Sequence, residues 1–75
     1  MAEFKDRMKQ LQEESGMPHW KIAELIGTSK SAVSQWIRGE TIPNASNLIL
    51  ICKYFDVSAD WVLGLSNFRK VKRNG

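Results

Sequence analysis

Residues 18–39 read PHWKIAELIGTSKSAVSQWIRG, and this stretch decides the fold. Ala23 precedes Gly27 by four residues, Val33 follows that glycine by six, and Trp36 comes shortly after. Two short helices that cross at about 90–120° need a small residue where they approach, a glycine that can adopt a positive φ, and large apolar residues on the second helix. The stretch meets these requirements in order. It therefore predicts a helix-turn-helix rather than an arbitrary pair of packed helices.

The sequence on either side of this stretch adds three further helices. Upstream, Phe4, Met8 and Leu11 recur at helical spacing until Ser15 and Gly16 end the helix. Downstream, residues 44–55 and 58–63 each open on a capping residue and carry a set of apolar residues. These sets are Leu48, Ile51, Cys52 and Phe55, then Trp61, Val62 and Leu63. With no strand alternation, we expect an all-α, compact bundle of about five short helices over residues 1–66, followed by a basic tail, 67–75.

Length and composition exclude several classes of protein. A chain of 75 residues has room for one core, and its single cysteine, Cys52, can build neither a disulfide framework nor a cysteine zinc site. We expect a buried thiol in a soluble, cytoplasmic protein, since no apolar run or secretory leader is evident. With one histidine and no glycine-rich phosphate loop after a strand, no catalytic set can be assembled. We expect no enzyme activity, no cofactor and no metal.

Net charge says little about the partner. The chain carries a net charge of +3, but Arg69, Lys70, Lys72 and Arg73 contribute +4, which leaves −1 for the rest. We expect this tail to be too polar to pack, and a basic tail is either a DNA contact or only a solvated chain end. An argument for nucleic acid therefore has to rest on where individual residues lie.

The second helix of the motif, over residues 29–38, has a polar face. On a helical wheel, Lys30, Ser31, Ser34, Gln35 and Arg38 fall within an arc of about 140°. In the major groove of DNA, glutamine can bond adenine bidentately, lysine can reach the acceptors of guanine, and serine adds no bulk. A merely solvated face is the alternative, but this arc contains no acid. The pattern favours a helix that enters the major groove.

A set of residues spread over most of the chain carries a resemblance to a known family. They are Leu11, Gly16, Ile22, Ala23, residues 25–27, Ser29, Val33, residues 38–40, Pro43, Asn44, Leu48, Ile51 and residues 56–64. From residue 4 to residue 65 the chain resembles the lambda-repressor-like, Cro/cI-type (XRE) helix-turn-helix family. The resemblance implies a five-helix domain that binds double-stranded DNA and is usually dimeric on it. Such domains are common among phage repressors, bacterial regulators and antitoxins.

The resemblance also implies roles for individual residues. Four positions match those with which the family reads bases: Lys30, Ser31, Ser34 and Gln35. Thr28, Arg38 and Thr41 match positions that grip the sugar-phosphate backbone. Their alternatives are a turn residue, a cation that favours the helix C-terminus, and a loop hydroxyl.

Four departures from the family pattern lie at the start of the motif. Pro18 replaces the usual capping serine or threonine, so a hydrogen bond worth about 1 kcal/mol should be missing. His19 stands where the family commonly has a glutamine that holds a phosphate and braces the recognition helix. Because imidazole titrates near about 6.5 in water, that contact could depend on pH, unless His19 is exposed and uninvolved. Trp20 and Lys21 replace an acidic pair, and Trp20 either packs on the first helix or contacts the DNA backbone.

Apolar residues in the C-terminal half exceed what one small core needs. Leu50, Tyr54, Leu65 and Phe68 are the candidates for a dimer interface. We expect a transcriptional regulator, a phage or bacterial repressor, that binds a pseudo-palindromic operator as a homodimer. The alternative is a protein-interaction module with the same fold, an antitoxin or regulatory adaptor, and affinity for duplex DNA that falls with salt would distinguish the two.

Overall fold

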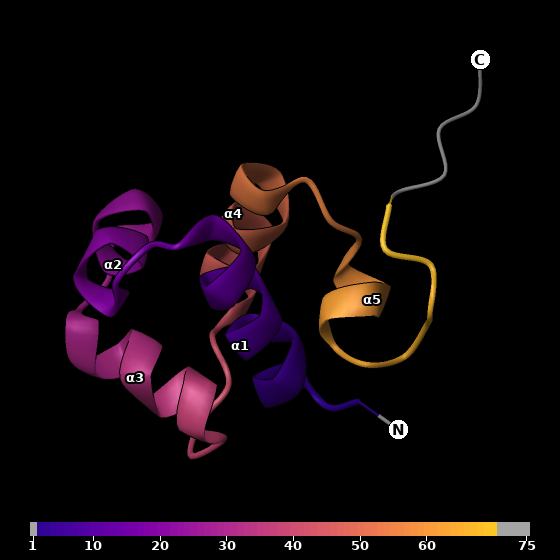
Figure 1. Cartoon of the computed structure of the whole chain (residues 1–75), viewed down its shortest axis with the longest axis horizontal. Helices are drawn as coiled ribbons and strands as arrows, with labels where there is room; N and C mark the ends of the chain where they lie inside the picture. The colour runs from indigo at the N-terminus through magenta and orange to yellow at the C-terminus, as the bar shows by residue number, and fades with distance from the viewer. Residues whose placement is uncertain (1, 71–75) are drawn as a thin grey trace.

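The computed structural model describes residues 2–70. They form five helices, α1 (Phe4–Ser15), α2 (His19–Ile26), α3 (Lys30–Arg38), α4 (Ala45–Phe55) and α5 (Ala59–Val62). Figure 1 shows α2 and α3 on one side of α1, and α5 with the C-terminal segment on the other. No strand occurs in the described residues. The predicted all-α bundle of about five short helices is confirmed.

Side-chain caps fix where three of the helices begin. The side chains of Ser29, Asn44 and Ser58 accept hydrogen bonds from backbone N–H groups three residues on, at 3.0, 2.8 and 3.0 Å. Each cap satisfies an amide that the first turn leaves without a partner. Pro18 precedes α2 and supplies no such bond, as predicted. The motif's first helix therefore depends on packing more than on its own N-terminus.

The turn between α2 and α3 depends on one glycine. Gly27 has a φ of 84°, in the left-handed region that a residue with a Cβ rarely adopts. Its N–H and that of Thr28 both donate to the carbonyl of Ala23, at 2.8 and 2.9 Å. This closes α2 and turns the chain directly into the cap of α3, as the sequence predicted.

The core is apolar and draws on all five helices. Its buried residues are Phe4, Met8, Leu11, Ile22, Ala23, Ile26, Val33, Trp36, Ile51, Val57, Trp61 and Val62. Leu48, Phe55 and Leu63 are half-buried against this cluster. Cys52 was expected to be buried and is only half-buried, because Ile51 occupies the centre of the buried side of α4 and the next residue lies about 100° around the helix. Burial still raises the pKa of the Cys52 thiol.

The chain after α5 packs on the domain as far as residue 70. The Arg69 guanidinium donates to both carboxylate oxygens of Glu14, at 3.0 and 2.6 Å, and lies 4.9 Å from the centroid of the Trp61 ring. The Ser58 N–H donates to the carbonyl of Arg69 at 2.7 Å, and Lys70 Nζ is 2.9 Å from Asp56 Oδ2. The expectation that the tail is too polar to pack is wrong for Arg69, which is half-buried against the Trp61 ring, whereas Lys70 meets an acid of the domain but stays exposed.

The rest of the predicted tail, including Lys72 and Arg73, lies outside the described residues. The domain boundary after residue 66 stays a prediction. None of the helices in residues 2–70 is long and apolar enough to cross a membrane.

Candidate nucleic-acid interface

The polar face of α3 lies at the edge of the bundle. Figure 1 shows α3 beside α2 and α1, on the side of the molecule away from α5. Val33 and Trp36 point into the core, Lys30, Ser31 and Arg38 are exposed, and Ser34 and Gln35 are half-buried. The helix contains no acidic residue. It can therefore present hydrogen-bonding groups to a polyanion without a fixed negative charge on its own surface.

His19 connects α2 to this face. Its Nδ1 lies 2.8 Å from Ser34 Oγ, and both side chains are half-buried. His19 is thus not exposed, as one alternative had it, and its contact with a phosphate stays a prediction. When the serine hydroxyl donates to Nδ1, the imidazole carries its proton on Nε2, which can donate to an outside acceptor. Ser34 then keeps lone pairs that can accept from a base.

Gln35 is held from the loop that follows α3. The N–H of Gly39 donates to the carbonyl of Trp36 at 3.2 Å, that of Glu40 to the carbonyl of Gln35 at 2.9 Å, and Gly39 has a φ of 78°. The reversed chain brings the hydroxyl of Thr41 to within 3.4 Å of Gln35 Oε1. The sequence indicated neither this contact nor its direction.

Arg38 at the end of α3 is paired with an acid. Its Nε and Nη2 donate to the two carboxylate oxygens of Glu40 at 2.9 and 3.0 Å. The hydrogen bonds raise the pKa of Arg38 and lower that of Glu40. Both side chains are exposed, so water and salt screen this pair. The helical pattern placed Arg38 on this face but gave no sign that Glu40 is its partner.

Trp20 lies in the first turn of α2, and Thr28 lies in the turn between α2 and α3. Trp20 is 54% exposed, and Lys21 Nζ lies 5.9 Å from its ring centroid. The indole is not part of the core, so an aromatic surface remains accessible beside His19. Thr28 is half-buried in the turn before α3.

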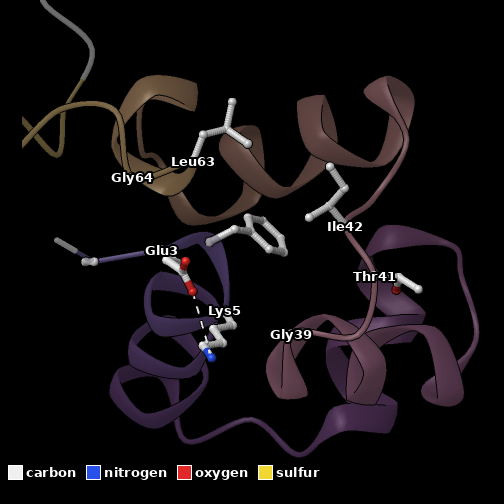
Figure 2. Close-up of a pocket in the computed structure, with 9 residues that line it drawn as sticks. Glu3, Lys5, Gly39, Thr41, Ile42, Leu63 and Gly64 are labelled. Carbon is white, nitrogen blue, oxygen red and sulfur yellow. Dashed lines mark ion pairs between the residues drawn. The ribbon is translucent and has the colours of Figure 1, made fainter.

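A surface pocket of about 700 Å³ lies beside the loop that carries Thr41. Figure 2 shows Ile42 and Leu63 on its two sides and the Glu3–Lys5 ion pair at its edge, with a nitrogen-to-oxygen distance of 3.8 Å. Ile42 points into the pocket, and Thr41 points the other way. Ile42 is 70% exposed and was not among the residues singled out from the sequence.

The predicted dimer-interface residues differ in exposure. Tyr54, Leu65 and Phe68 are exposed, whereas Leu50 is half-buried against the core. Ile49 on α4 is also exposed, at 58%. Helical periodicity alone could not separate Leu50 from Ile49, because they are adjacent in a stretch that is apolar throughout.

Sequence comparison with known proteins finds a helix-turn-helix family and two regulators of transcription. The sequence model of the Helix-turn-helix family matches residues 8–62. The chain is 33% identical over 61 residues to the HTH-type transcriptional activator BcrR of Enterococcus faecalis, covering 81% of this chain and 30% of that protein. It is 40% identical over 42 residues to Repressor protein C2 of Salmonella phage P22, covering 56% of this chain and 19% of the repressor. The chain thus spans less than a third of the length of these two relatives.

Solved structures share the fold. The crystal structure of the P22 c2 repressor in complex with a synthetic operator superposes with a TM-score of 0.82 at 27% identity, over 88% of this chain and all of that chain. A transcriptional regulator from Listeria innocua gives a TM-score of 0.80 at 29% identity, over 96% of this chain and 65% of that one. The chain therefore shares its fold with both of these proteins.

Proposed function

The chain belongs to the helix-turn-helix family of the Cro/cI type, and on that basis we propose that it regulates transcription by sequence-specific binding to double-stranded DNA. The resemblance inferred from the sequence is thereby confirmed. One observation carries the proposal. The acid-free, polar face of α3 belongs to a domain that superposes closely on a repressor solved with its operator.

In this proposal α3 lies in the major groove and reads base edges. Lys30 and Ser31 are exposed at its N-terminal end, where the long Lys30 side chain can reach furthest. Gln35 lies four to five residues further along the same face, and Ser34 contributes the lone pairs that His19 leaves free. Direct contacts of this kind distinguish base pairs, since each pair presents a different set of donors and acceptors in the major groove.

A second group contacts the sugar-phosphate backbone and sets the position of α3. His19 donates from Nε2 while Ser34 orients its ring. Trp20 packs against the backbone beside it, Thr28 contacts it from the turn, and Arg38 does so at the far end of α3. Such contacts add affinity for any sequence. Arg38 must leave Glu40 to make its contact.

The protein pairs on DNA. A helix of nine residues reads only a few base pairs, so two copies on a pseudo-palindromic site give useful selectivity. The interface that we propose consists of the exposed Tyr54, Leu65 and Phe68 and the half-buried Leu50. Repression is the regulatory outcome that we propose, in the cytoplasm, where bacterial and phage DNA lies.

Two measurements test the function. Binding to random duplex DNA should weaken steeply as salt rises, and repeated selection from a random pool should converge on one two-fold symmetric sequence. Absence of duplex binding at low salt, together with binding to another protein through the exposed apolar residues, would favour the interaction module instead.

Pairing has a separate test on the selected site. Half-sites about 10 bp apart place the two copies in successive major grooves, about 34 Å apart. Insertion of five base pairs between them should abolish cooperative binding, because it turns one half-site by about half a turn. If five added base pairs leave binding unchanged, the copies do not pair symmetrically.

A further inference from the structure

The loop after α3 fixes the position of Thr41 relative to Gln35. The left-handed Gly39 and the bond from the Glu40 N–H to the Gln35 carbonyl, 2.9 Å long, reverse the chain directly over the last turn of the helix. A side chain at position 39 could not be added freely, since its Cβ would lie 2.6 Å from Lys5 Cδ. The backbone at residue 41 is therefore held against the helix by geometry that does not depend on its own side chain.

Thr41 points toward α3 and away from the pocket. Figure 2 shows the Thr41 and Ile42 side chains on opposite sides of the loop, with Ile42 directed into the pocket. The Thr41 hydroxyl donates to Gln35 Oε1 at 3.4 Å. A hydroxyl has a single hydrogen, so Thr41 cannot give this bond and donate to a phosphate oxygen at the same time.

The bond also changes what Gln35 can offer to a base. A carboxamide that reads adenine uses its oxygen to accept from N6 and its nitrogen to donate to N7. With one lone pair of the oxygen turned to Thr41, the NH₂ group, which only donates, is the end of the carboxamide that is fully free. Guanine presents two acceptors, N7 and O6, in the major groove.

We propose that Thr41 is a positioning residue that orients the carboxamide of Gln35 so that it selects guanine over adenine. This inference rests on the proposed function and assigns Thr41 a role in specificity in place of the backbone contact suggested by family resemblance. At 3.4 Å the hydrogen bond is long, so its contribution to base preference is modest.

The test compares Thr41→Val, which keeps the shape and loses the hydroxyl, with Thr41→Ser, which keeps the hydroxyl. Each is made in the wild-type and the Gln35→Ala background, and bound sequences are selected from a random duplex pool. The base pair read by Gln35 is the one whose preference disappears in Gln35→Ala. Wild type should prefer guanine there, Thr41→Val should reduce the guanine-to-adenine ratio about twofold, and Thr41→Ser should retain it. In the Gln35→Ala background, Thr41→Val should change nothing further.

Three other outcomes contradict the inference. A preference of the wild type for adenine would show that the carboxamide is oriented the other way. If Thr41→Val lost the same affinity on all sequences, also in the Gln35→Ala background, Thr41 would instead contact the sugar-phosphate backbone of DNA. If the wild type selects no sequence at all, the proposed function fails with the inference, and this result differs from the first two.

Discussion

Cations lie at both ends of the molecule, and they differ in whether an acid is paired with them. Arg69 and Lys70 follow α5, and each is paired with an acid of the domain, Glu14 and Asp56. Lys30 begins α3, a helix without an acidic residue. The sequence suggested that the tail was the more basic element, yet the structure commits its two described cations to contacts within the fold. The comparison teaches that a run of basic residues in the sequence does not by itself locate a site for a polyanion, because the fold can pair those residues with acids.

The largest loss of DNA affinity should come from a substitution on α3. Gln35→Ala should cost about 1–3 kcal/mol on the preferred site and little on random DNA, because it removes a base contact. Arg69→Gln, on the other side, should leave base preference unchanged. Titration of both variants on a selected site and on a scrambled duplex measures the difference. Equal losses on both duplexes for Gln35→Ala would contradict its role in reading bases.

A substitution in the segment after α5 should lower the thermal stability of the domain. Arg69→Gln weakens the contact with the Trp61 ring and removes the charge partner of Glu14, so we expect Tm to fall by about 4 °C at neutral pH.

The same pair predicts how stability depends on pH. Hydrogen bonding to Arg69 lowers the pKa of Glu14 from 4.5 to about 2 in the folded chain. The stabilisation is therefore present above pH 4.5 and is lost as the pH falls toward 2. Thermal unfolding from pH 7 to pH 2 should show a smaller decline for Arg69→Gln than for wild type. Parallel curves would mean that the pair contributes nothing to folding.

Whether the sequence predicted a contact depends on how far apart its two residues lie along the chain. Helical periodicity placed Val33, Trp36 and the buried face of α1 correctly, since those patterns repeat within one helix. The pair between Arg69 and Glu14 joins residues 55 apart, and nothing in a local pattern indicates it. The contact between Thr41 and Gln35 depends on how Gly39 turns the chain, which spacing does not specify. The sequence located the helix that carries the candidate site, but not the partners that orient its side chains.

The smallest effect concerns Arg38, which lies on α3 but, like Arg69, is paired with an acid. Glu40→Gln frees its guanidinium, so affinity should rise about twofold on all duplexes alike and depend more steeply on salt. Asp60→Asn is the control, since it removes the same charge from an exposed position on α5. Binding isotherms at three salt concentrations distinguish the two variants. An increase confined to the selected site would instead mean that Glu40 affects base reading.

The most direct test of the account asks which end of the molecule touches DNA. Backbone amide shifts of the full chain can be followed by NMR as a selected duplex is added. We predict that the largest changes fall on Lys30, Ser31, Ser34 and Gln35 and on the start of α2, while Arg69 and Lys70 keep their shifts and their contacts. Changes concentrated in residues 58–70, with α3 unaffected, would contradict the assignment of α3 as the helix that reads DNA.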